Sequence, residues 1–223
     1  MEFSRKVVLA EDIINILGFF VAFFVLRRKK NIPKYMITFF WYPVVALSFT
    51  IFYFLKEYLK LFPSQFYSVA NNLSLLFHFV FLSIFIINSE HTKTKKRSYL
   101  VFWGFLILVI ISLILKDISF GNRLAFGIAN SGLVILCIFY YYSIVKNTGS
   151  LALAADPSFW VANGIFFGMI LNVPTYIARN FIDKENSYEI WSVLFAVCSF
   201  AYIIMHIFFI KAYLCIIRPH KLI

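Results

Sequence analysis

The sequence predicts an all-α fold in which a single domain, residues 1–223, forms a polytopic membrane bundle of seven transmembrane helices. The composition is the first reason: 62% of the residues are hydrophobic and 14% are charged, whereas soluble domains average about 45–50% and about 25%. The second reason is that the apolar residues gather in seven long runs. Seven spans of about 20 residues need about 140 residues, which leaves no room for a separate domain outside the membrane.

We expect helices over the runs 8–26, 35–56, 67–88, 99–115, 122–145, 158–179 and 190–213. Charged or turn-forming residues end the first six runs, in order, at 27–30, 56–57, 90–97, 116–117, 146–149 and 183–186. In lipid, only helices and closed barrels satisfy all their backbone hydrogen bonds, and barrel strands would alternate in segments of about ten residues. The first run is followed by basic residues and has no small-residue cleavage site, so we expect a span rather than a signal peptide.

The distribution of charge predicts an external N-terminus and a cytoplasmic C-terminus, because basic residues concentrate in the loops on the cytoplasmic side. In this orientation the cytoplasmic segments contain two acidic residues, Glu90 and Asp156. Their basic residues are Arg27, Arg28, Lys29, Lys30, Lys34, Lys93, Lys95, Lys96, Arg97, Lys146, Lys211, Arg218 and Lys221. The outer segments hold equal numbers of basic and acidic residues, so the whole net charge of +11 lies on one side.

These charges also predict the partners and the location of the chain. Basic loops beside helix ends are typical of contact with anionic lipid head groups at the cytoplasmic face, so we expect a lipid bilayer as partner and no nucleic acid. The predicted location is the cytoplasmic (inner) membrane of a bacterium. Cys137, Cys198 and Cys215 lie inside apolar runs without a CxxC pair, which indicates buried free thiols, and no cofactor is expected.

Polar residues at membrane depth are costly and normally face protein or water, so they mark candidate ligand-binding positions. Several of them repeat at helical spacing on the runs 67–88, 158–179 and 190–213, which we therefore expect to meet in the bundle. Interhelical hydrogen bonding is the alternative role of these side chains. The candidate residues are Asn71, Ser74, His78, Arg123, Asn172, Arg179, Ser199, Tyr202 and His206. In addition, Gly164-x-x-x-Gly168 predicts close packing of its helix on a neighbour.

His78 and His206 are the two intramembrane histidines, and we expect them to line one internal cavity. Their roles are open between structural hydrogen bonding, pH sensing and metal binding. Ser74-x-x-x-His78 resembles an element of the seven-helix metal hydrolases that include alkaline ceramidases, but Ile210 stands where that family has a further histidine. No catalytic residue and no metal ligand is therefore predicted.

The predicted outer rim carries Glu11, Asp12, Arg123 and Arg179 near helix ends. One interpretation is that these side chains are simply solvated. The other is that the two arginines pair with Glu11 or Asp12, or hold the carboxylate of a ligand between them.

Two segments carry a resemblance: "DPSFWVANG" at 156–164 and "HIFFIKAYLC" at 206–215. With them the chain resembles uncharacterised seven-helix membrane proteins of Bacteroidota, some of whose related spans are joined to histidine-kinase regions. The resemblance implies a sensory or signal-input role with a membrane or cytoplasmic signalling partner. It carries over no catalytic residue.

The first functional hypothesis is therefore an integral membrane sensor or signal-input module that binds a small or lipidic ligand within the helix bundle. The alternatives are a small transporter or channel, and a membrane-embedded lipid-modifying metal hydrolase. Enzymatic activity is the least supported of these readings, because no catalytic constellation is visible in the sequence.

The predicted orientation is testable with reporter fusions. A reporter that is active only in the cytoplasm should be active when fused after Ile223 and inactive when inserted near Lys184. The physical reason is the retention of basic loops on the cytoplasmic side during insertion. The reverse pattern of activities would contradict the argument from charge.

Overall fold

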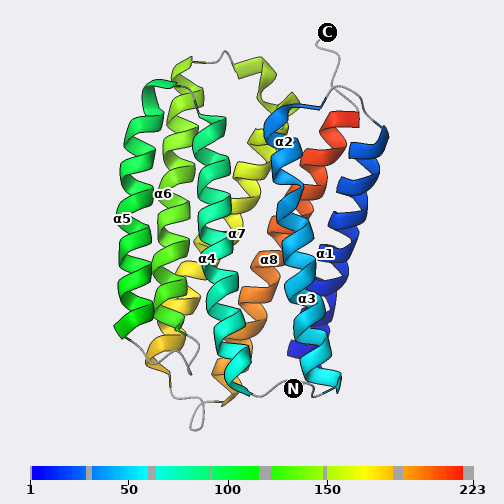
Figure 1. Ribbon diagram of the computed structural model, residues 1–223, viewed down its shortest axis with the longest axis vertical. Coiled ribbons are helices and arrows are strands. Elements are labelled where there is room, and N and C mark those ends of the chain that lie inside the picture. Colours follow the sequence, from blue (N-terminus) through cyan, green and yellow to red (C-terminus); the bar gives the residue numbers. More distant parts are fainter. Residues whose placement is uncertain are drawn as a thin grey trace.

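The computed structural model describes residues 2–28, 32–59, 64–90, 92–115, 122–147, 150–182 and 188–217. Within these ranges all regular secondary structure is helical, and Figure 1 shows the helices running up and down in one bundle. The elements are α1 (Glu2–Arg28), α2 (Lys34–Phe39), α3 (Trp41–Leu59), α4 (Ser64–Ser89), α5 (Thr92–Leu115), α6 (Arg123–Asn147), the 3₁₀ helix η1 (Ser150–Ala155), α7 (Pro157–Phe181) and α8 (Tyr188–Ile217).

Seven stretches of the described chain are long and apolar enough to cross a membrane, which confirms the predicted fold class. They are Lys6–Arg28, Lys34–Leu55, Ser68–Ser89, Thr94–Leu115, Arg123–Lys146, Pro157–Phe181 and Glu189–Ile217. As an odd number of spans requires, α1 begins at one end of the bundle and α8 finishes at the other (Figure 1). We call the end that holds Arg28, Lys34, Lys96 and Lys146 the basic end; its assignment to the cytoplasm stays a prediction.

The second span differs from the single helix predicted over 35–56, because it consists of α2 and α3 with a turn at Phe40. Pro43 provides the physical reason: it has no backbone N–H to donate to the carbonyl of Phe39, four residues earlier. Phe40 itself keeps a helical conformation, with φ −58° and ψ −31°. The expected uninterrupted helix is therefore wrong, although α2 and α3 still form one continuous span (Figure 1).

Other helix ends extend beyond the predicted runs. α5 begins at Thr92 rather than at residue 99, and α8 ends at Ile217 rather than at residue 213. Apolar runs mark only the part of a helix that lies in hydrocarbon, whereas polar and basic residues such as Lys95 and Lys96 continue the helix outside it.

The closest helix packing lies between α7 and α8, and two glycines permit it. A Cβ atom added to Gly164 would lie 2.9 Å from the backbone oxygen of Met205 and 2.9 Å from the Cβ of Phe208. At Gly168 it would lie 3.0 Å from the Cβ of Met205. These distances leave no space for a side chain, which confirms the packing role predicted for Gly164-x-x-x-Gly168.

The remaining helices are arranged around this pair. α6 packs between α5 and α7, while α1 packs along the other side of α8 and contacts α3. α4 contacts mainly α6 and α5, and it touches α7 less. Of the three runs predicted to meet, 158–179 and 190–213, which form α7 and α8, therefore pack directly against each other. α4 reaches α8 through side chains, with the rings of His78 and Tyr202 5.8 Å apart.

The glycine contact predicts the outcome of a substitution. Gly164→Leu should lower the free energy of unfolding in detergent by about 1–3 kcal/mol, because overpacking forces α7 away from α8. The melting temperature should fall accordingly. The matched control is Gly104→Leu on α5, where an added Cβ has no neighbour within 4 Å among the residues that the structure describes. Equal melting temperatures for the two variants would contradict the proposed packing.

Candidate functional site

Polar side chains from five helices gather in the interior of the bundle, although they lie far apart in the sequence. We call this group the polar centre. It consists of Glu11 and Asn15 on α1, Tyr42 on α3, His78 on α4, Asn172, Tyr176 and Arg179 on α7, and Cys198, Ser199, Tyr202 and His206 on α8. Six of the nine candidate residues predicted from the sequence belong to the polar centre. They are His78 on α4, Asn172 and Arg179 on α7, and Ser199, Tyr202 and His206 on α8.

His78 is held between two tyrosines. The hydroxyl of Tyr42 lies 2.8 Å from Nδ1 of His78, at hydrogen-bonding distance. The ring of Tyr202 meets the imidazole edge to face, with centroids 5.8 Å apart and an angle of 85° between the ring planes. The second ring nitrogen, Nε2, is buried and has no hydrogen-bond partner among the described residues. His78 therefore connects α3, α4 and α8 and retains one free position for hydrogen bonding.

His206 lies beside a small internal cavity, also lined by Asn15 and Tyr42, with a volume of about 10 Å³. This volume is close to the minimum for one water molecule. His78 is not among the residues that line this cavity, so the cavity does not by itself unite the two histidines, and their sharing of one cavity stays a prediction. The connection runs instead through Tyr42, which lines the cavity and contacts His78.

Arg179 is buried, with 7% of its surface exposed, and its guanidinium lies among aromatic rings. The Cζ atom is 4.5 Å from the ring centre of Trp191 and 5.3 Å from that of Phe195, distances at which cations and aromatic faces attract. Its Nη1 lies 3.9 Å from the sulfur of Cys198. Tyr176, one turn away, hydrogen-bonds to Tyr202 through its side chain, which joins this region to His78.

The arginines and Glu11, which were expected at the outer rim, contact other groups rather than one another in the described structure. Arg123 donates from Nη1 to the backbone oxygen of Arg179, at 2.5 Å. Glu11 points toward α8 and hydrogen-bonds with Ser199. Of the interpretations of the rim, the structure therefore does not show pairing of the arginines with Glu11, because aromatic rings and a carbonyl group surround the two guanidinium groups.

Two buried asparagines lie at the same level of the bundle. Asn172 is fully buried, and neither its Oδ1 nor its Nδ2 has a hydrogen-bond partner among the described residues. On α6, Asn130 is 1% exposed and its Nδ2 is also unpartnered within the described part of the chain. The ring centres of Phe126 on α6 and Tyr176 on α7 lie 4.9 Å apart. The two helices are antiparallel, so Asn130 and Asn172, each about one turn from this pair in the same direction, lie at a similar depth in the bundle.

The predicted face of α4 is displaced by about one residue. Asn71 and Ser74 are only half-buried, whereas the neighbouring Asn72 is 8% exposed. The buried face of this helix follows Ser68, Asn72, Leu75, Phe79 and Leu82. The structure thus brings neither Asn71 nor Ser74 into the polar centre by any described contact.

A second polar network lies at the basic end. Asp156 caps the N-terminus of α7, accepting from the backbone N–H of Ser158 at 2.9 Å and from its hydroxyl at 2.7 Å. Tyr35 of α2 donates to the same carboxylate at 3.1 Å, and Tyr140 of α6 lies 2.8 Å from the Ser158 hydroxyl. The network therefore joins α2, α6 and α7 at one point.

Glu90 is the other acidic residue of the basic end and is only 5% exposed. The hydroxyl of Ser98 lies 2.8 Å from each of its carboxylate oxygens. Burial raises the pKa of the Glu90 carboxyl above its ordinary value, while hydrogen bonds from Ser98 and Thr94 and the charge of Lys95 act in the opposite direction.

In the described part of the chain, no three side chains among His, Cys, Asp and Glu lie close enough together to hold a metal ion. Cys137, Cys198 and Cys215 are buried free thiols, as predicted. Comparison with protein-family models, curated proteins and solved structures gives no match to this chain. The resemblance to seven-helix proteins of Bacteroidota therefore stays a prediction.

Several members of these sites were not among the predicted residues. Tyr42 and Tyr176 carry no distinguishing signal, because the chain contains 13 tyrosines and their partners lie on distant helices. Asp156 followed by Pro157 is, in contrast, a recognisable helix start, with a capping residue before proline at the first helical position.

The environment of Glu90 predicts a pH effect on stability. At low pH the carboxyl is protonated in both the folded and the unfolded chain. As the pH rises, the unfolded chain ionises first because the folded pKa is raised, so stability falls until the folded carboxyl ionises as well. Glu90→Gln, which still accepts a hydrogen bond, should remove this part of the decline in melting temperature measured from about pH 4 upward.

The control for this experiment is Glu189→Gln, the same change at an exposed position on α8. It should leave the decline of the wild-type melting temperature in place. If Glu90→Gln and the wild type lose stability in parallel over the whole range, Glu90 is not responsible.

Proposed function

We propose that this chain is an integral membrane sensor, a signal-input module that binds a small or lipidic ligand within the helix bundle. In this proposal, the polar centre receives the ligand, and the change is passed to a membrane or cytoplasmic signalling partner. The observation that carries the proposal is the set of buried polar atoms without partners in the described structure: Nε2 of His78 and the amide atoms of Asn172.

The cost of these atoms is the first supporting argument. A buried polar atom without a hydrogen bond costs about 1–3 kcal/mol, and polar groups at membrane depth are normally functional. Leu or Phe at position 172 or 78 would avoid this cost. A ligand with donors and acceptors would satisfy the free atoms and so gain affinity from groups that are already in place.

The way the centre is closed is the second argument. Its internal cavity of about 10 Å³ does not accommodate a molecule much larger than water, so a ligand requires movement of a helix. α3 is the element best placed to move, since it packs sparsely on α4 and Tyr42 links it to His78. Opening and closing of α3 would give the two arrangements that a sensor needs.

The experiment is native mass spectrometry of the purified protein, to identify the molecule that it retains. The double variant His78→Gln and His206→Gln should retain this molecule at least about tenfold less than the wild type, because glutamine cannot reproduce both imidazole nitrogens.

A hydroxyl deletion serves as the finer test. Tyr42→Phe removes the contact with Nδ1 of His78, and Tyr142→Phe makes the same change on an exposed tyrosine. Reduced retention in the first variant alone supports the proposal. Equal retention in both variants removes the polar centre from ligand binding. Solute flux in vesicles that depends on the same residues would favour the transporter alternative.

A further inference from the structure

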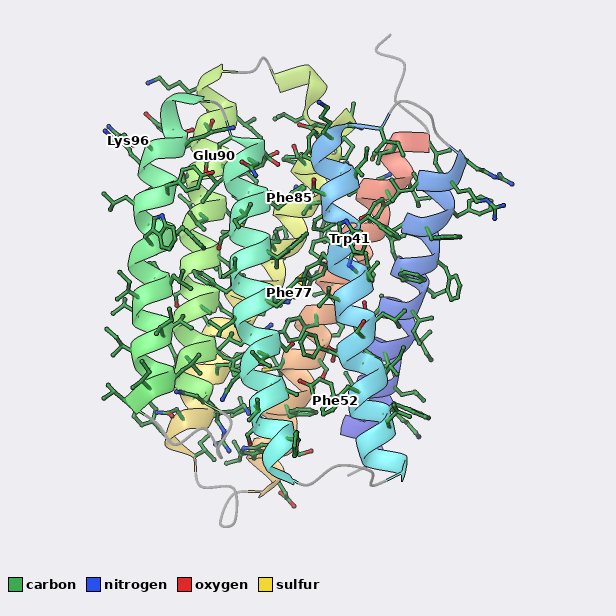
Figure 2. All side chains as sticks on the ribbon, in the orientation of Figure 1. Trp41, Phe52, Phe77, Phe85, Glu90 and Lys96 are labelled. Carbon is green, nitrogen blue, oxygen red and sulfur yellow. The ribbon has the colours of Figure 1, made fainter. Side chains whose placement is uncertain are left out.

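A second candidate site lies outside the polar centre, in a groove between α2 and α4. Its cavity volume is about 320 Å³, which falls within the range of small-molecule sites. Five apolar side chains of α4 form the wall: Phe77, Val80, Phe81, Ile84 and Phe85. Figure 2 shows Phe77 and Phe85 on α4, toward α2 and α3.

The lining of the groove is polar at one end only. Tyr35 and Thr38 of α2 and Asn88 of α4 complete the lining, and all three lie in the helix turns nearest the basic end. An apolar groove that ends in polar groups at the membrane surface is suited to an amphiphilic ligand. The apolar part of such a ligand would lie at membrane depth and its polar part at the interface.

Two lysines stand at this polar end. Lys95 donates from Nζ to the backbone oxygen of Asn88 at 3.3 Å, which holds its charge beside the groove. Lys34 is exposed and lies one helical turn from Thr38, whose hydroxyl donates to the Lys34 backbone oxygen at 3.2 Å. The nearby carboxylate of Glu90 is bonded by Ser98, and that of Asp156 by Ser158 and Tyr35. Lys34 is therefore available to an external anion, and Lys95 lies at the same end of the groove, where its charge also acts on the Glu90 carboxyl.

We propose that this groove binds one anionic phospholipid from the leaflet at the basic end. An acyl chain lies against the wall from Phe77 to Phe85, and the phosphate lies between Lys34 and Lys95. The site is separate from the ligand position of the proposed function. Its lining shares no residue with the polar centre, so the lipid site rests on its own evidence.

The groove suits a single acyl chain, because its volume is about 320 Å³ and its long wall is apolar, with polar groups only at the end nearest the membrane surface. The charge selects an anionic head group, because each lysine near the membrane surface attracts an anionic lipid by about 1 kcal/mol.

The test is a titration of delipidated protein with phosphatidylglycerol or phosphatidylcholine, followed by native mass spectrometry. The wild type should bind one phosphatidylglycerol molecule more tightly than it binds phosphatidylcholine. Lys34→Gln with Lys95→Gln should weaken phosphatidylglycerol binding by about 25-fold, or about fivefold for each lysine, and leave phosphatidylcholine binding unchanged. The charge-matched control is Lys96→Gln with Lys146→Gln; Figure 2 shows Lys96 on the outer side of α5.

A second pair of variants tests the acyl-chain position. Ile84→Trp should fill the groove and remove the tight lipid, whereas Ile111→Trp, on the lipid-facing surface of α5, should not. If the two lysine pairs weaken binding equally, the attraction is a diffuse surface effect and the site is refuted. Unchanged lipid binding in Ile84→Trp refutes it as well.

The same titration separates this site from the polar centre. The His78→Gln and His206→Gln variant should still bind one phosphatidylglycerol molecule, because neither histidine lines the groove. The sensor proposal can then fail while the lipid site stands, and the lipid site can fail while ligand retention at the polar centre is unaffected.

Discussion

The glycine contact between α7 and α8 is the interaction on which the rest of this structure depends. Inside a bilayer, helices gain little from leaving the surrounding lipid, so close van der Waals packing must hold them together. Gly164 and Gly168 allow the α7 backbone to approach that of α8 at Met205. This register sets Tyr176 opposite Tyr202 and Arg179 opposite Cys198, so the polar centre exists only while the two helices stay in this alignment.

The opposite side of the bundle is held differently. α1 and α3 are joined by a hydrogen bond between Asn15 and Thr50 at 3.1 Å, and α3 meets α4 through Tyr42 and His78. Such interhelical hydrogen bonds contribute about 0.6 kcal/mol on average, so a few of them can break and re-form during function. The protein therefore combines a tightly packed half, formed by α6, α7 and α8, with a half in which α3 has fewer restraints.

The sequence predicted the features that depend on local pattern. The seven spans follow from hydrophobic length, and the packing role of Gly164 and Gly168 follows from their spacing. The phase of each helix was harder, because both the lipid-facing and the protein-facing sides are apolar, and a step of one residue turns the side chain by about 100°. For this reason Asn71 was expected at the position that Asn72 occupies. Long-range pairs such as Tyr42 and His78 depend on helix register, which one sequence does not encode in a readable pattern.

The polar centre and the lipid groove share a wall of aromatic rings, and this has a consequence for how they would work together. Phe77 and Phe81 line the groove, and their rings lie 6.2 Å and 5.9 Å from that of Tyr42. Tyr42 in turn contacts His78 through its hydroxyl. Rings packed in this way do not compress, so a chain that enters the groove and displaces Phe77 also changes the position open to Tyr42. Any coupling of this kind is reciprocal: a ligand that favours one position of α3 alters lipid affinity by the same factor by which the lipid alters ligand affinity. An anionic lipid would then set the sensitivity of the centre without touching the ligand itself.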